Sequence, residues 1–378
     1  MSLTSEATAG TMDERPQTVI PNPFTGMAGV VQVLLRQLPP ALLAPEVGAT
    51  LLSSARLLAP IRQGGFGCRL SGQDTRVDVQ QCIQKRDGQQ ETLRTYLAME
   101  GARSPSWRRL SSLVNAWAGE GSPLSTGVEE IWIELDNNGR QRDPVVFVGL
   151  APTLHGEEAY TVATHALTFL FTQEGERSVL PALRRCFEAC PAGARVGHIG
   201  VMLGRGVEAL RVNVKGLFPH GTLPYLDRVG WDGPLQTFRY LHEELAVVAE
   251  RAALCLDVNG DVQPTLALEC GVASPNGQRL WWDALLNFLM EIGLCTPAKR
   301  AAVLRWPGST AAFQSDTGWP VDLIADSLLR GPNELGLMRR AISHIKVTVQ
   351  TATRVEAKAY LWFNHEWMSL PQYREWTA

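Results

Sequence analysis

The sequence predicts an α+β protein with a ten-stranded antiparallel β-barrel, built from five α-β-β-α repeats with the helices outside. Two short β-prone runs joined by a turn, then a helix-prone stretch, recur five times along the 378 residues. Two of the turns contain Asn-Gly, which is the strongest short-range hairpin signal. The turns recur at intervals of about 65, 67, 55 and 93 residues, so one late interval carries an insertion. Ten antiparallel strands with helices between them can close without leaving a sheet edge.

The five hairpins are expected where β-prone residues flank turn residues. The paired runs cover 66–81, 130–150, 196–217, 254–272 and 345–363. Their turns lie near residues 72, 138–139, 204–206, 259–260 and 351–354. Each interval has room for one hairpin and one or two helices.

Helix-prone stretches precede and separate these hairpins. The apolar stretch from about residue 29 to 58 is broken by prolines at 39, 40 and 45, which predicts two helices. Further helical stretches are expected over 91–117, 158–189, 234–253 and 281–293. In 234–253 apolar residues recur at helical spacing, so one face of that helix should pack against the sheet.

The chain is expected to form one barrel domain, residues 26–378, behind a flexible leader. Residues 1–25 are rich in Thr, Ser and Pro, which is typical of such leaders. An irregular insertion is expected at about 296–340, because Pro and Gly interrupt it repeatedly. Its Trp306 and Trp319 are expected to be exposed. The insertion either contributes to acceptor binding at a barrel mouth or packs on the barrel's exterior.

Composition excludes several classes of function. The net charge is −3, so the basic surplus of a nucleic-acid binder is absent. No apolar run approaches the ~18 residues of a membrane span. The start of the chain carries Glu6, Asp13 and Glu14 and lacks the apolar region of a signal peptide, so a cytoplasmic location is expected. Seven cysteines without a C-x-x-C pair indicate reduced thiols, and the scattered histidines predict no metal site.

Period-two alternation gives every hairpin a polar face. In 210–216, Arg211, Asn213 and Lys215 share one side, opposite apolar residues. Because the helices must bury their apolar stripes against the sheet, the polar side should face the lumen, and ten strands should leave a cavity there. Inward cations and aromatic residues are expected at Arg211, Lys215, Lys346, Lys358, Trp132, Tyr360 and Trp362. Four cations with few counter-charges predict an anionic ligand.

These features resemble the ABBA-fold (PT-barrel) prenyltransferases, which include aromatic, indole and ribosomal-peptide enzymes. Lys358-Ala359-Tyr360 fits the family's strand signature Lys-x-Tyr, and residues 211–215 fit its Arg-x-Lys-x-Tyr pattern in part. The resemblance covers roughly residues 60–365. Several hairpins lack the tyrosines that form the family's shield around the allylic group.

The resemblance implies a prenyltransferase that moves an allylic isoprenoid group from its diphosphate to an aromatic small molecule or a peptide side chain. Preorganised cations would stabilise the departing diphosphate, and aromatic faces would stabilise the carbocation. The diphosphate ligands would be Arg211, Lys215, Lys346 and Lys358, and the pocket and cation shield would comprise Tyr360, Trp362, Trp132 and Asn213. Glu134 or Glu269 would take the proton, unless these carboxylates neutralise a neighbouring lysine. The sequence requires no cofactor and leaves Mg²⁺ open.

Two other functions compete with this one. The same barrel without transferase activity would hold a peptide or small molecule for a partner enzyme in a natural-product maturation pathway. A propeller-like hydrolase of guanidines would need a catalytic cysteine near the C-terminal end, and the last cysteine is Cys295.

Overall fold

The computed structural model describes residues 26–86, 88–99, 104–137, 143–203, 209–272, 278–315 and 318–377. Its strands form one sheet in the order β11-β1-β2-β3-β4-β5-β6-β7-β8-β10-β9. The strands are β1 (Gln63–Arg69), β2 (Val77–Gln84), β3 (Val128–Leu135), β4 (Val145–Leu150), β5 (Arg195–Val201), β6 (Leu210–Lys215), β7 (Arg251–Asn259), β8 (Asp261–Gly271), β9 (Gly308–Ala311), β10 (Glu334–Val349) and β11 (Val355–Ser369).

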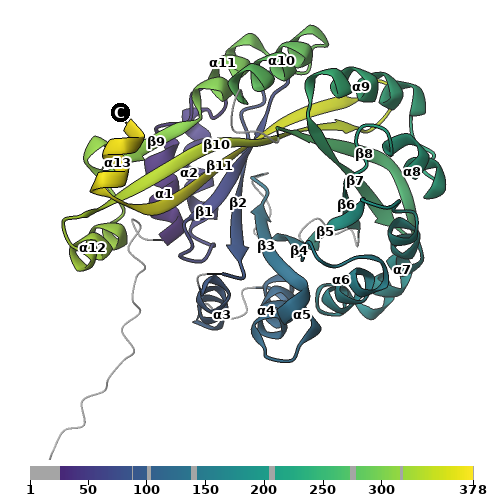
Figure 1. The fold of residues 1–378 in the computed structure, drawn as a ribbon, viewed down its shortest axis with the longest axis horizontal. Helices are drawn as coiled ribbons and strands as arrows, with labels where there is room; N and C mark the ends of the chain where they lie inside the picture. Colours follow the sequence, from purple (N-terminus) through teal and green to yellow (C-terminus); the bar gives the residue numbers. More distant parts are fainter. Residues whose placement is uncertain are drawn as a thin grey trace, which may run out of the picture.

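Strand β11 closes ten of these strands into a barrel. It pairs antiparallel with β1 along the whole of that strand and with β10 over nearly its own full length. Strand β9 stays outside the closed wall and pairs with Leu337–Arg340 of β10, in the arm where β10 and β11 run beyond the barrel (Figure 1). The predicted ten-stranded antiparallel barrel is therefore confirmed, with one short strand added.

The helices surround the barrel on its outside (Figure 1). Several begin at residues whose side chains cap the first turn, such as Ser104, Thr172 and Thr296. The helices are α1 (Gly26–Leu35), α2 (Pro45–Ala55), α3 (Gln89–Met99), α4 (Pro105–Ala118), α5 (Pro123–Gly127), α6 (Gly156–Leu170), α7 (Gln173–Glu188), α8 (Thr222–Arg228), α9 (Leu235–Val248), α10 (Gln278–Glu291), α11 (Pro297–Arg305), α12 (Val321–Arg330) and α13 (Leu370–Thr377).

The core lies between the sheet and this layer of helices. In β6, Leu210, Val212 and Val214 are fully buried and belong to the same apolar cluster as the inner faces of the helices. Phe238 and Leu245 of α9 are buried in that cluster, as the helical spacing predicts. The apolar side of each strand is buried against the helices outside the barrel, so the polar side faces the lumen.

Some predicted boundaries are wrong. The helix expected over 234–253 ends at Val248, because Arg251 already pairs with Gly271 as the first residue of β7. Strand β10 begins at Glu334, inside the expected insertion, because it pairs with the equally long β11. The expected leader, residues 1–25, and the turns at 138–139 and 204–206 lie outside the described residues.

The two tryptophans expected to be exposed in the insertion are buried. Trp306 is fully buried; its ring meets Phe66 edge-on at 5.8 Å, and its Nε1 donates a hydrogen bond to the Trp362 carbonyl at 3.1 Å. Trp319 is also buried. The expectation fails because Pro and Gly breaks mark irregular backbone without excluding burial, and an indole gains much free energy when its large apolar surface leaves water.

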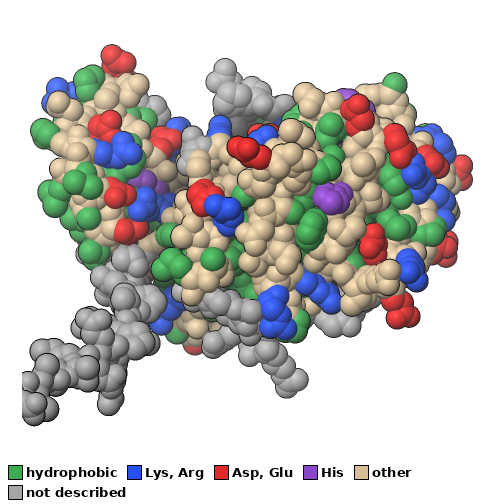
Figure 2. Space-filling model, turned by 90° about the horizontal axis from the view of Figure 1, so that it is seen from below, with side chains coloured by type: hydrophobic (Ala, Val, Ile, Leu, Met, Phe, Trp, Pro, Cys, Tyr) green, Lys and Arg blue, Asp and Glu red, His purple; other side chains and the backbone are tan. Residues whose placement is uncertain are grey.

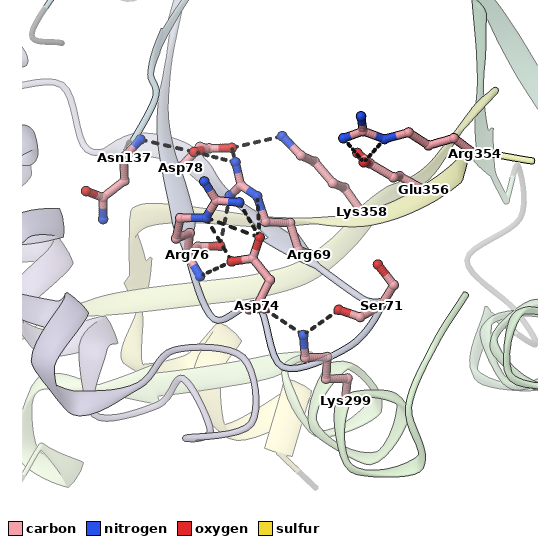
Figure 3. A network of polar contacts seen from close by, with 10 residues as sticks. All are labelled: Arg69, Ser71, Asp74, Arg76, Asp78, Asn137, Lys299, Arg354, Glu356 and Lys358. Atoms are coloured by element: carbon pink, nitrogen blue, oxygen red, sulfur yellow. Dashed lines mark hydrogen bonds and ion pairs between the residues drawn. The ribbon is translucent and has the colours of Figure 1, made fainter. Parts of the chain in front are cut away.

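The insertion also holds one hairpin turn in place. Lys299 of α11 is buried, and its Nζ donates hydrogen bonds to the carbonyl oxygens of Ser71 at 3.2 Å and Asp74 at 2.6 Å (Figure 3). These carbonyls lie in the connection between β1 and β2. A segment far along the chain therefore fixes the first turn of the barrel.

The remaining sequence expectations about class can be compared with the structure. Within the described residues, no helix combines the length and apolar character needed to cross a membrane. All seven cysteines are free and six of them are buried, as predicted. On the face shown in Figure 2, acidic and basic side chains are interspersed, in keeping with the small net charge.

A buried histidine in the arm of β10 and β11 predicts pH-dependent stability. His365 packs against Trp367 with ring centroids 5.0 Å apart, and its Nε2 is buried without a described hydrogen-bond partner. Burial, then the charge of Arg62, lowers the pKa of His365 to about 3. Its unfolded pKa is about 6.5, so below that pH the unfolded chain binds more protons than the folded one. The stability that His365 contributes by staying neutral is therefore complete above pH 6.5 and is lost as the pH falls.

We expect His365→Phe to flatten this dependence, because phenylalanine keeps an aromatic ring and cannot bind a proton. Urea unfolding at pH 6.5 and pH 5 measures the effect. Between these values the wild type should lose on the order of 2 kcal/mol more of its free energy of unfolding than the variant. Equal losses in the two proteins would show that His365 does not titrate in this window.

Candidate active site

The polar faces of the strands point into the barrel, as the alternation predicts. Inward residues of neighbouring strands meet at the same level, because the strands pair in register. Lys346 of β10, for example, lies directly opposite Glu269 of β8 on one side and Lys358 of β11 on the other. The lumen is therefore lined by side chains from strands far apart in the sequence.

Two adjoining compartments make up the lumen. The larger has a volume of about 460 Å³ and the smaller about 180 Å³, and Arg211, Lys346 and Tyr360 border both. Lys215 borders only the larger compartment and Lys358 only the smaller. Of the residues predicted for the site, those bordering the larger compartment are Trp132, Glu134, Arg211, Asn213, Lys215, Glu269, Lys346, Tyr360 and Trp362.

Glu269 and Lys346 form an ion pair in the wall of the larger compartment. The Lys346 Nζ lies 2.9 Å from Oε1 of Glu269, and Asn213 Nδ2 donates a hydrogen bond to Oε2 at 2.7 Å. Burial alone would raise the pKa of Glu269, but the charge of Lys346, the nearby His344 and hydrogen bonds from Lys346 and Cys255 together hold it well below its usual range. Both oxygens of Glu269 are engaged, and its charge neutralises Lys346.

The other two paired cations also have carboxylate partners: Arg211 meets Asp257 of the neighbouring strand β7, and Lys358 of β11 meets Asp78 of β2, with β1 between them. Arg211 binds Asp257 with two of its three donor nitrogens, Nε to Oδ1 at 2.7 Å and Nη2 to Oδ2 at 2.9 Å. Lys358 Nζ lies 3.0 Å from Oδ2 of Asp78, and Arg69 lies 3.2 Å from the same oxygen (Figure 3). Asp78 is only 1% exposed, so these cations compensate a fully buried charge.

The expectation of a lumen with few counter-charges is wrong. Three of the four predicted cations, Arg211, Lys346 and Lys358, each pair with a carboxylate. The physical reason is that like charges a few ångströms apart repel by about 4 kcal/mol per pair at an effective dielectric constant of ~20. Carboxylates on adjacent or next-but-one strands remove this repulsion. In addition, the four cations do not gather in one compartment.

One end of the larger compartment keeps an excess of positive charge. Lys215 and Arg251 border this compartment, and Arg195, which is not among its lining residues, lies directly opposite Lys215 across β5 and β6. None of the three pairs with an acidic residue in the described part of the chain. Burial, then the charge of Arg195, lowers the pKa of Lys215. Nη1 of Arg195 is buried and has no hydrogen-bond partner among the described residues. We call these three residues the cationic end.

Aromatic rings form part of the wall of the larger compartment. Trp132 and Phe147 face each other across β3 and β4, and Tyr360 and Trp362 come from β11. The Phe147 ring lies over Gly200, where a Cβ atom would come within 2.4 Å of the ring. Glycine at this position therefore makes room for an aromatic side chain inside the barrel.

A β-bulge adds a histidine that sequence reasoning missed. The register between β10 and β11 shifts between Ile342 and His344, so that Ser343 and His344 both border the larger compartment. The His344 ring stacks on Tyr360, with centroids 4.3 Å and planes 17° apart. Burial is the main cause that lowers the pKa of His344, to about 4. Regular period-two alternation puts consecutive residues on opposite faces of a strand, so it could not have placed both Ser343 and His344 at the cavity.

Glu130 and His198 were also missed. Nε2 of His198 lies 2.9 Å from Oε1 of Glu130, and Cys82 Sγ contacts Oε2 at 3.6 Å. Burial opposes ionisation, yet the contacts with His198 and Trp132 lower the pKa of Glu130 to about 2. Glu130 lies on the same face of β3 as Trp132 and Glu134, so the period-two alternation could have predicted its inward position. Arg251 was missed because the strand was expected to begin at 254.

The predicted proton acceptor Glu134 lies beside an acidic cluster. It is buried, and Gln80 Nε2 donates a hydrogen bond to its Oε2 at 2.5 Å. Oxygens of Asp78, Glu134 and Asp136 lie within 4.8 Å of one another, close enough to share one cation. Lys358 and Arg69 already compensate Asp78. We therefore derive no step from a metal at this cluster.

Comparison with solved structures identifies the fold. PriB in its apo form matches with a TM-score of 0.51 and 14% identity over 88% of this chain and 94% of that one. AnaPT from Neosartorya fischeri matches with a TM-score of 0.56 and 12% identity over 89% of this chain and 91% of that one. A 6-dimethylallyl tryptophan synthase matches with a TM-score of 0.50 and 14% identity over 89% of this chain and 96% of that one. No family model and no curated protein matches the sequence. The chain thus has the PT-barrel fold that the sequence resemblance implied.

The ion pair of Lys358 predicts a stability effect. Lys358→Met should lower the free energy of unfolding by about 2 kcal/mol, because buried Asp78 loses one of its two cations while Arg69 remains. Denaturant unfolding at pH 7 measures this. The double variant Lys358→Met/Asp78→Asn should regain most of the loss, since it removes the uncompensated charge. A single variant as stable as the wild type would contradict the assigned pair.

Proposed function

We propose that this chain transfers an allylic isoprenoid group from its diphosphate to an aromatic acceptor. The observation that supports this most is the juxtaposition, in one cavity of about 460 Å³, of a partly aromatic wall with Lys215 and Arg251, two cations that have no acidic partner among the described residues. That volume falls within the range of pockets that enclose small organic ligands. Among the proteins with this fold, PriB is named a prenyltransferase and another is named a dimethylallyl tryptophan synthase.

The cationic end suits the diphosphate of the donor. Lys215, Arg195 and Arg251 lack acidic partners among the described residues, and Arg195 has a buried donor nitrogen without an acceptor. A diphosphate would supply the missing negative charge and acceptor oxygens. When the allylic C–O bond breaks, its electron pair leaves with the diphosphate, and the same cations stabilise the growing charge. Preorganised charges of this kind cost no reorganisation at that moment.

The roles expected for the other three cations change accordingly. Arg211, Lys346 and Lys358 already have carboxylate partners, so binding diphosphate would require each to leave its partner. We therefore propose Lys215 as a direct ligand. The other three maintain the electrostatic balance of the lumen.

The aromatic wall suits the carbocation and the acceptor. The faces of Trp132, Tyr360 and Trp362 offer negative quadrupole potential to an allylic cation and keep water from it. Asn213 and Cys255 border the same space and give it a polar side. A cavity of this size favours a small aromatic molecule, or a single aromatic side chain of a peptide, over a larger acceptor.

The competing function is a barrel that binds such ligands without reaction. It is favoured by one observation: three of the four cations expected to act on diphosphate are compensated internally. Incubation with dimethylallyl diphosphate and a panel of aromatic acceptors including L-tryptophan, followed by mass spectrometry, separates the two functions. A transferase gives a prenylated acceptor. A binding protein is protected against unfolding by the ligands and leaves the donor intact.

The donor site predicts a specific loss of affinity. We expect Lys215→Met to weaken binding of dimethylallyl diphosphate about tenfold, equivalent to ~1.4 kcal/mol, because one charge-assisted contact is lost. Ligand-dependent shifts of the thermal unfolding midpoint measure this affinity.

The matched control is Arg94→Gln on the outer helix α3, where Arg94 pairs with Glu91 away from the lumen. It removes one positive charge from the protein and should leave the affinity unchanged. If Lys215→Met binds the diphosphate as tightly as Arg94→Gln does, the cationic end is not the donor site.

A further inference from the structure

Helix α12 turns its apolar face outward. That face carries residues at i, i+3, i+4, i+7 and i+8, namely Val321, Ile324, Ala325, Leu328 and Leu329. All five are exposed, and Leu328 and Leu329 are 79% and 88% exposed. In a surface helix such an apolar stripe normally faces the core. No described residue buries it here, and an exposed apolar patch of this kind marks a contact site.

The side of α12 that faces the protein is the polar one. The carboxylates of Asp322 and Asp326 both pair with Arg62, at 2.7 and 3.2 Å, and Leu323 is buried. Asp322 Oδ2 also accepts a hydrogen bond from the backbone N–H of Gly26 at 3.1 Å. Together with packing on β10, these contacts hold α12 on the arm (Figure 1) and leave its apolar face in solvent. The orientation of the helix therefore depends on ion pairs and one buried leucine.

The hydrogen bond of Gly26 shows where the expected leader joins the described chain. Residues 1–25 precede that amide, so they join the chain beside the first turn of α12. The most apolar stretch of this segment is 19–24, which reads Val-Ile-Pro-Asn-Pro-Phe, whereas residues 4–18 are mostly polar. A ten-residue helix is about 15 Å long and six extended residues span about 20 Å, so 19–24 can reach the whole face.

The size of the face favours a segment of the same chain over a separate molecule. One side of α12 measures about 15 Å by ~10 Å, whereas a stable interface between proteins buries ~800 Å² on each partner. A tethered segment needs less area, because its effective concentration at the face is high and no second molecule has to be immobilised. The polar side of α12 is acidic, whereas helices that lie on anionic lipid carry Lys and Arg there.

We propose that residues 19–24 cover the outward apolar face of α12. Their apolar side chains pack on the exposed stripe, and the hydrogen bond between Gly26 and Asp322 marks the point from which the segment runs along the helix. Pro21 and Pro23 suit this role, because they favour an extended backbone and lack N–H groups that burial would leave unpaired. The contact lies on the arm, outside the barrel, and is independent of the proposed transfer reaction.

Amide hydrogen exchange of α12, followed by mass spectrometry, tests this contact in the full chain. Phe24→Asp should speed exchange of the α12 amides about tenfold, equivalent to ~1.4 kcal/mol, because a charge in the segment releases it from the apolar face. The matched control is Thr11→Asp, which adds the same charge to the polar part of the leader and should leave exchange unchanged. Helix α9, which lies away from the arm (Figure 1), should exchange at the same rate in all three proteins.

Sedimentation velocity and co-sedimentation with vesicles of phosphatidylcholine and phosphatidylserine test the other occupants. Leu328→Asp should change neither the sedimentation coefficient nor the binding to vesicles. A dimer that Leu328→Asp dissociates would assign the face to a second copy of the chain, and vesicle binding that this variant loses would assign it to a lipid surface. Either result, or equal exchange of α12 in Phe24→Asp and Thr11→Asp, overturns the proposal.

Discussion

Charge compensation between side chains of different strands is the constraint on which the interior of this barrel depends. A closed wall removes inward charges from bulk water, so a buried ion persists at neutral pH only beside an opposite charge. Asp78, Asp257 and Glu269 each meet a cation from another part of the chain. The pair of Lys358 and Asp78 joins β11 to β2 across 280 positions of sequence. The electrostatic balance of the lumen thus depends on the same register that closes the sheet.

Most of the predicted inward cations are paired with a carboxylate. The cations without an acidic partner among the described residues therefore say more about a ligand than the paired ones do. Lys215 and Arg251 border the same compartment as the rings of Trp132, Tyr360 and Trp362. The cavity therefore combines cationic and aromatic side chains. An allylic diphosphate likewise combines an anionic head with an apolar tail. This agreement between ligand and cavity supports the proposed function more strongly than the sum of inward cations does.

The repeated hairpin pattern and the period-two alternation along each strand made much of this architecture predictable from sequence. Hairpins follow from turn residues between β-prone runs, and the inward face of β6 or β11 follows from counting by two. Partners on other strands could not be predicted, because alternation gives a residue's side of the sheet without giving its neighbour across the ladder. The bulge at His344 could not be predicted either, since it breaks the count. Trp306 was placed wrongly because local Pro and Gly say little about burial by distant residues such as Phe66.

Closure by β11 also has a consequence for synthesis of the protein. Strands β10 and β11 are the last barrel strands to leave the ribosome, yet they join β8 to β1. Until they emerge, β1 and β8 present unpaired backbone edges of the kind that recruit strands from other chains. A barrel completed by contacts between the two halves of the chain has a high contact order, which slows folding. The nascent chain is therefore most exposed to aggregation just before its last hairpin is made, and chaperone binding at that stage would protect the two open edges.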